Sequence, residues 1–137
     1  YQVNATYYSA LGASDEKMLL ARAIQMFMPG KPQVWYLDLF AGKNDHEAVQ
    51  RAGESGHKEI NRTNLSVDQI AEGLKKDVVQ KQLALIRMRN THKAFSEGAE
   101  VTISGEESSL EIRWEYDGAY AELHVNFEEG TYTIESN

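Results

Sequence analysis

The sequence predicts a segment of a parallel α/β structure followed by a small antiparallel β-domain, and three observations support this fold class. Residues 34–40 form an almost unbroken apolar run between Pro32 and Gly42, which is typical of a strand covered on both faces in a parallel sheet. A helix-like stretch over 15–28 precedes this run. After Gly98 apolar residues recur at every second position, as they do in antiparallel strands.

The composition of the 137-residue chain excludes several classes of partner. A net charge of −7 disfavours nucleic acid, whose phosphates need a basic surface. No apolar run is long enough to span a membrane, so we expect no membrane partner. Cysteine is absent and no signal peptide is visible, and both are compatible with a cytoplasmic protein.

The first predicted helix begins at Ser14 or Asp15, either of which can cap it. From Met18 onward only Arg22 and Gln25 interrupt the apolar residues, so the helix is expected to be buried on most sides. The strand over 34–40 needs a parallel neighbour, and the sequence offers no second strand of this kind. We therefore expect the chain, which starts at Tyr1 and not at methionine, to be part of a longer protein.

A polar segment over 43–65 follows this strand and reads as a long loop. Loops at the carboxyl end of a parallel strand are where α/β folds place their sites. Asp45, His46 and His57 match no ligand spacing of a known metal site, so we expect no metal there. Residues 1–12 combine tyrosines with amide side chains, which suits a sugar site or, alternatively, a packed surface loop.

An amphipathic helix is predicted from Asp77, because apolar residues recur at helical spacing. Beyond it, Asp117-Gly118 is a type I′ hairpin signal between two alternating runs, and Glu129-Gly130 marks the next turn. Since so short a sheet cannot make its own core, it must pack on what precedes it. The predicted domains are residues 1–96 and residues 97–137.

Several motifs fall in order along the chain: Tyr1–Gly12, Leu20–Ile24, Pro29-Gly30, Pro32–Val34, Ala41–Asp45, Ile60–Arg62 and Leu85–Asn90. Together they resemble the sucrose phosphorylases of the α-amylase superfamily, over residues 1–96 by motif and over the β-domain by position. The resemblance implies a (β/α)8 barrel, of which residues 1–96 are the last helix–strand–helix part, followed by a C-terminal antiparallel β-domain.

The activity implied by the resemblance is the transfer of a glucosyl group from an α-glucoside to phosphate, giving α-glucose 1-phosphate with retention and without a cofactor. None of the acidic residues here matches the family's nucleophile or acid/base motifs. We therefore expect no catalytic residue in this chain, and no activity from the chain alone. Its expected partners are the glucoside, inorganic phosphate, and the N-terminal barrel of the same polypeptide or another copy of the chain.

The resemblance implies Tyr1, Gln2, Lys58 and Arg62 as substrate-binding residues, and Asp38, where the chain departs from the family pattern, is a further candidate. Tyr1 and Gln2 correspond to a mobile loop on the acceptor side. In the family a basic residue closes the glucosyl subsite, and in sucrose-specific members it is an arginine. The corresponding residue here is Lys58. Because lysine is a point charge and not a planar fork, the role either sits on Lys58 or has shifted to Arg62. Asp38 adds a carboxylate near the barrel mouth, or is a hydrogen-bonded structural acid.

Two departures from the sucrose-specific pattern leave the substrate open. The chain has Tyr36–Phe40 where those enzymes tend to have Tyr-Val-Gly-Leu-Leu, and Thr63-Asn64 where they have His-Tyr. Glucosylglycerate or sucrose 6′-phosphate are possible substrates in place of sucrose, and an anionic one would use His57, Lys58 or Arg62. A hydrolase or transglucosidase with the same barrel would also fit these residues, and so would a non-catalytic carbohydrate-binding module.

Overall fold

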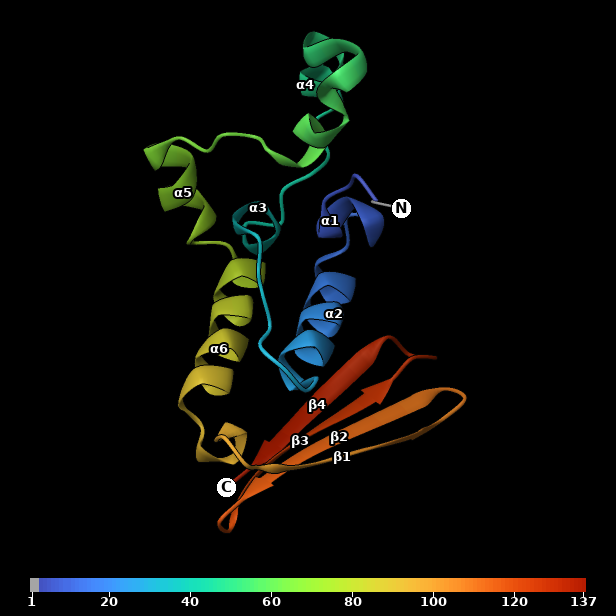
Figure 1. Ribbon diagram of the computed structural model, residues 1–137, viewed down its shortest axis with the longest axis vertical. Helices are drawn as coiled ribbons and strands as arrows, with labels where there is room; N and C mark the ends of the chain where they lie inside the picture. Colours follow the sequence, from blue (N-terminus) through green and yellow to red (C-terminus); the bar gives the residue numbers. More distant parts are fainter. Residues whose placement is uncertain (1–2) are drawn as a thin grey trace. The chain divides into compact units, whose positions relative to one another are not determined.

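The computed structural model describes residues 3–137 (Figure 1). The chain forms two compact units. The first unit comprises the chain up to Met18 together with Gln33–Gln80, and the second comprises Leu19–Pro32 with Lys81–Asn137. Tyr1 and Gln2, both predicted to bind substrate, lie outside the described residues. None of the helices in residues 3–137 combines the length and apolarity that crossing a membrane requires.

The first unit consists mainly of short helices. These are α1 (Tyr7–Ala10), α3 (Tyr36–Leu39), α4 (His46–Ala52), the 3₁₀ helix η1 (Gly53–Asn61) and α5 (Val67–Gly73). The polar segment predicted to be a long loop is therefore largely helical. Asp45 caps α4 by accepting a hydrogen bond from the Ala48 N–H at 2.9 Å. Ser66 caps α5 through a capping box with Gln69. These side chains satisfy N–H groups at the helix starts, a signal that the hydrophobic pattern alone did not reveal.

The predicted strand over residues 34–40 is not present. Trp35 is extended, but α3 begins immediately after it, and the Leu39 and Phe40 N–H groups donate to Trp35 and Tyr36 carbonyls. Within residues 3–137 the structure contains one sheet, made of β1 to β4, so these residues have no strand beside them. Because buried backbone groups must be paired, a helical turn, which pairs them locally, replaces the strand.

The second unit holds most of α2 (Asp15–Phe27), much of α6 (Asp77–Thr91), the 3₁₀ turn η2 (Lys93–Phe95) and the sheet. Both long helices were predicted from their apolar pattern and are confirmed. The sheet contains β1 (Glu100–Glu106), β2 (Ser109–Tyr116), β3 (Ala119–Asn126) and β4 (Thr131–Ser136), which are antiparallel in sequence order (Figure 1). The β2–β3 turn has φ of 46° at Asp117 and 77° at Gly118, as a type I′ turn requires.

The core of the second unit lies on the apolar face of this sheet. Ile112 and Leu123 are fully buried, and they face each other across β2 and β3. Trp114 packs against Phe95, with ring centroids 5.3 Å apart, and its indole N–H donates to the Phe27 carbonyl at 2.6 Å. The sheet thus uses helix α2 and turn η2 to cover its apolar face, as its short length predicted.

Arg89 of α6 links these elements with polar contacts. Its guanidinium carbon lies 4.2 Å from the Trp114 ring centroid, and its N–H groups donate to the carbonyls of Met26 and Gly30 at 3.0 and 2.7 Å. These carbonyls lie at and beyond the end of α2, where the helix leaves acceptors without intrahelical donors. Burial lowers the pKa of Arg89. Arg89 therefore supplies donors to the end of α2 while packing on the core.

Candidate functional site

The predicted substrate-binding residues within the described part of the chain all belong to the first unit, and hydrogen bonds of that unit define the candidate site. Helix α1 is held at its start by two tertiary acceptors. The Thr6 N–H donates to Asn44 Oδ1 at 2.7 Å, and the Tyr7 N–H donates to Asp38 Oδ1 at 2.8 Å. Thr6 Oγ1 accepts from the Ser9 N–H at 3.1 Å as the helix cap. The segment that follows Tyr1 and Gln2 is thereby fixed to residues 38–44.

Asn44 makes a second contact with the same segment. Its own N–H donates to Ser9 Oγ at 2.9 Å. Asn44 therefore makes hydrogen bonds to the segment around α1 with both its backbone and its side chain. The neighbouring Asp45 receives a hydrogen bond from Thr63 Oγ1 at 3.3 Å, and its N–H donates to the Ile60 carbonyl at 2.9 Å. Residues 44–45 therefore join the segment around α1 to the end of η1.

Two aromatic side chains attach the same end of η1 to α3. The Trp35 indole N–H donates to the Asn61 carbonyl, and the Tyr36 hydroxyl donates to the Thr63 carbonyl, both at 2.9 Å. The Asn61 amide in turn donates to the Ala5 carbonyl at 3.4 Å. The rings of Trp35 and Tyr36 are 4.9 Å apart and remain partly exposed. We call the residues joined by these bonds, 5–9, 35–45 and 60–63, the anchored platform.

Asp38 lies within the anchored platform and is 7% exposed. Asp38 accepts a hydrogen bond from the Tyr7 N–H, which favours the interpretation that it is a structural acid. The sequence pattern placed Asp38 at the end of a strand, whereas it occupies the first turn of α3. A substrate-binding role for Asp38 remains a prediction.

The predicted basic residues lie at the end of η1. Lys58 is exposed within η1, and Arg62 follows its last residue. Arg62 pairs with Glu59 at 3.4 Å, and its side chain is 49% exposed. Because such exposed pairs are worth about 0–1 kcal/mol, the guanidinium is available to a more strongly charged ligand.

Arg62 also lines a hollow of about 510 Å³ beside the anchored platform. The lining residues are Asp45, Ala48, Arg51, Ala52, Glu59, Arg62, Thr63 and Asn64. Two guanidinium groups, two carboxylates and a hydroxyl offer hydrogen bonds to a polar ligand. The structure brings Arg62, but not Lys58 or Asp38, to this hollow.

Sequence reasoning did not assign a role to Asn44 or Arg51. Asn44 was noticed only as part of the Ala41–Asp45 motif. Its partner Thr6 lies 38 positions away along the chain, and no local pattern encodes that contact. Arg51 forms an exposed pair with Glu47 one helical turn earlier, which reads as an ordinary solvated helix face.

Known proteins are similar to this chain along almost its whole length. No protein-family model matches the chain. The sucrose 6(F)-phosphate phosphorylase of Ilumatobacter coccineus is 52% identical over 134 residues, covering 98% of this chain and 25% of that protein. A sucrose phosphorylase of Agrobacterium vitis is 42% identical and covers 98% of this chain and 27% of its own length.

A solved structure gives the same result. The crystal structure of sucrose 6F-phosphate phosphorylase from Thermoanaerobacter thermosaccharolyticum matches with a TM-score of 0.91 and 42% identity, over 99% of this chain and 27% of that one. These relatives are glucoside phosphorylases, and the chain spans about a quarter of their length. The chain is homologous to the C-terminal part of the sucrose phosphorylase family, which confirms the resemblance seen in the motifs.

Proposed function

We propose that this chain is the C-terminal part of a retaining glucoside phosphorylase, which transfers a glucosyl group from an α-glucoside to phosphate. The observation that carries the proposal is the similarity to glucoside phosphorylases along almost the whole chain. Residues 1–96 would then belong to the (β/α)8 barrel, whose other strands would supply the neighbour that residues 34–40 lack within residues 3–137, and residues 97–137 would form the C-terminal β-domain. A carbohydrate-binding module is the less favoured alternative, because these relatives are enzymes.

The chemistry of such an enzyme needs two carboxyl groups that we place outside this chain. A carboxylate attacks the anomeric carbon while a carboxylic acid protonates the leaving oxygen, and a glucosyl ester forms. Phosphate then attacks the same carbon, releasing the carboxylate and giving α-glucose 1-phosphate. Within this chain the expected work is binding and positioning, which a fixed backbone does best.

The anchored platform supports a positioning role. Tyr1 and Gln2, proposed to line the acceptor side, precede a segment whose backbone N–H groups donate to the side chains of Asn44 and Asp38. The segment's exit is fixed as well, because Ser9 accepts from the Asn44 N–H.

The proposed natural substrate is a phosphorylated glucoside of the sucrose 6(F)-phosphate type. The relative with 52% identity is a protein named for that substrate. Cationic side chains bind a phosphoryl group, and the chain offers Lys58 in the last turn of η1 and Arg62 just after it. Arg62 suits this role because a guanidinium binds phosphate oxygens bidentately, while its present partner Glu59 holds it only by an exposed pair.

The test is phosphorolysis by the full-length enzyme with sucrose and with sucrose 6(F)-phosphate. Arg62→Ala and Lys58→Ala should reduce kcat/KM for the phosphorylated substrate by about 10- to 150-fold if either binds the phosphoryl group, since a hydrogen bond to a charged group contributes roughly 1.5–3 kcal/mol. The matched control is Lys75→Ala, because Lys75 is an exposed residue of the same unit paired with Glu72.

Two results would decide against parts of the proposal. If Arg62→Ala and Lys58→Ala change turnover of both glucosides equally, the substrate assignment is wrong, while the phosphorylase assignment stands. If the full-length protein binds sugar but releases no α-glucose 1-phosphate from any of sucrose, sucrose 6(F)-phosphate and glucosylglycerate, the phosphorylase assignment fails and the binding-module alternative takes its place.

A further inference from the structure

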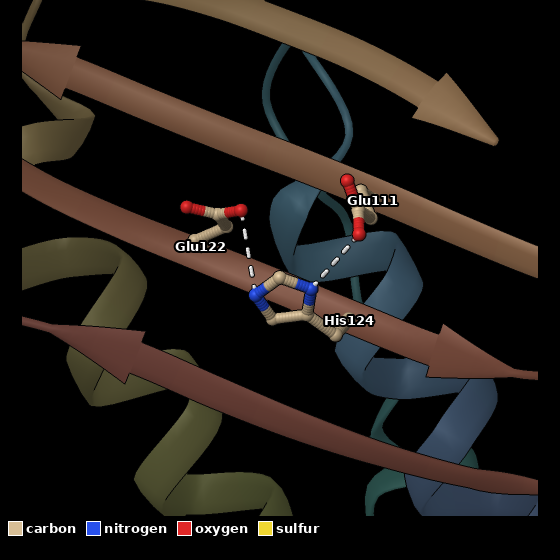
Figure 2. A group of neighbouring side chains, drawn as sticks. All are labelled: Glu111, Glu122 and His124. Carbon is tan, nitrogen blue, oxygen red and sulfur yellow. Dashed lines mark hydrogen bonds and ion pairs between the residues drawn. The ribbon is translucent and has the colours of Figure 1, made fainter.

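The polar face of the C-terminal sheet carries a cluster of two carboxylates and an imidazole, to which the proposed function assigns no role. Glu111 of β2 lies directly opposite His124 of β3, and Glu122 precedes His124 by two positions on the same strand. Because side chains alternate along a strand, all three point to one face. Figure 2 shows the imidazole of His124 between the two carboxylates.

The distances within this cluster suit a shared cation. His124 Nδ1 lies 3.3 Å from Glu111 Oε1, and His124 Nε2 lies 3.3 Å from Glu122 Oε1. One nitrogen or oxygen of each residue lies within 4.8 Å of the others. A tetrahedral zinc ion bound at about 2.0–2.2 Å separates neighbouring ligand atoms by roughly 3.3–3.5 Å. Small side-chain rotations are therefore enough to bring ligands onto one ion.

The carboxylate of Glu122 is already oriented for this role. Its Oε2 accepts a hydrogen bond from Arg113 Nη1 at 2.7 Å, which leaves Oε1 directed at the imidazole. Arg113 is itself fixed, since it pairs with Glu115 at 3.1 Å and stacks over Tyr120 at 4.3 Å. The side chain of Glu122 is only 20% exposed. Such outer contacts hold a ligand in position before the metal arrives.

The imidazole is oriented in the same way. A histidine ligand binds a metal through one ring nitrogen while the other donates its proton to a carboxylate. Glu111 lies beside Nδ1 and Glu122 Oε1 lies beside Nε2 (Figure 2), so Glu111 can hold Nδ1–H while Nε2 and Glu122 Oε1 remain for a cation. Further glutamates on β1, β2 and β4 point to the same face of the sheet and add negative charge around the cluster. They are Glu100, Glu106, Glu115 and Glu135.

We propose that Glu122 and His124, with Glu111 orienting the imidazole, form a binding site for a divalent transition-metal cation such as Zn²⁺ on the outer face of the C-terminal sheet. Imidazole and carboxylate together favour zinc-like ions over Mg²⁺ or Ca²⁺, which prefer oxygen alone. Both proposed ligands lie on β3, and Glu111 of β2 would hold the imidazole from the neighbouring strand. The remaining coordination positions would be filled by water.

The test is calorimetric titration of the full-length protein with Zn²⁺ at pH 7, compared between variants. The wild type should bind one equivalent that His124→Ala and Glu122→Gln lose. Glu111→Ala should bind about 10- to 100-fold more weakly, as loss of an orienting partner does. His46→Ala and Glu106→Gln are the matched controls and should retain the equivalent, because they remove an exposed histidine and a glutamate of the same face outside the cluster.

A second measurement separates metal binding from any effect on folding. Excess Mg²⁺ should not compete with Zn²⁺ for the wild-type site, because Mg²⁺ prefers oxygen ligands alone. Equal stoichiometry and affinity in the wild type and His124→Ala would overturn the proposal. So would loss of the equivalent in Glu106→Gln to the same extent as in Glu122→Gln.

Discussion

Asn44 gives the clearest test of the anchored platform, because one side-chain atom satisfies a buried backbone donor. Thr6 is 1% exposed, and its N–H donates to Asn44 Oδ1 at 2.7 Å. Asn44→Ala removes that acceptor and leaves the donor buried without a partner. The cost of such an orphaned group is about 1–3 kcal/mol, and at 1.4 kcal/mol per factor of ten this predicts a roughly 5- to 150-fold increase in local opening.

The assay is amide hydrogen exchange on the full-length protein, followed in peptides that contain Thr6–Leu11 and in peptides from the sheet. Asn44→Ala should speed exchange in the first set by that factor and leave the sheet unchanged, because local opening reports the stability of the segment itself. Asn44→Asp is the matched control, since its carboxylate keeps an oxygen in the acceptor position. Unchanged exchange in Asn44→Ala, or an equal increase in Asn44→Asp, would refute the reasoning.

Two further predictions concern the second unit. Ile112→Ala should destabilise the protein by about 2–5 kcal/mol in thermal unfolding, because Ile112 is fully buried. Ile103→Ala should cost much less stability, because the Ile103 side chain is 48% exposed. Similar losses of stability in the two variants would contradict the core assignment. Lys93 donates to Asp117 at 2.6 Å and lowers the pKa of that carboxyl below its usual 3.8, so the pair stabilises the fold above pH 3.8 and loses this contribution as pH falls through the lowered pKa. Asp117→Asn should remove that part of the acid dependence in pH-dependent unfolding, and an unchanged acid profile would contradict it.

The candidate site could be anticipated only in outline. Lys58 and Arg62 were reached through the resemblance, and the structure places both at the end of η1 without showing a ligand-binding role for either. The anchored platform was not anticipated, because its bonds join residues such as Thr6 and Asn44 that are 38 positions apart. Single side chains that accept one distant hydrogen bond leave no periodic signal in a sequence.

The strand predicted over residues 34–40 was wrong, again because the sequence pattern does not reveal contacts with distant residues. Its apolar run was read as a strand buried on both faces, yet only Leu37 and Asp38 are buried, and Trp35 and Tyr36 remain partly exposed. An apolar run encodes burial, not the hydrogen-bonding partner that makes a strand. Within residues 3–137 that partner is absent, and the chain pairs its backbone groups within α3.

The sequence by itself determined the elements whose period is local. The helix starting at Asp15, the amphipathic helix from Asp77, and the alternating strands with their Asp117-Gly118 turn follow from side-chain spacing and from the backbone angles that a tight turn demands. Only the tertiary structure decided which acceptor holds α1, which side chains share the polar face with His124, and where Arg89 directs its donors. These contacts depend on strand register and helix packing, which bring together atoms that are distant in the chain.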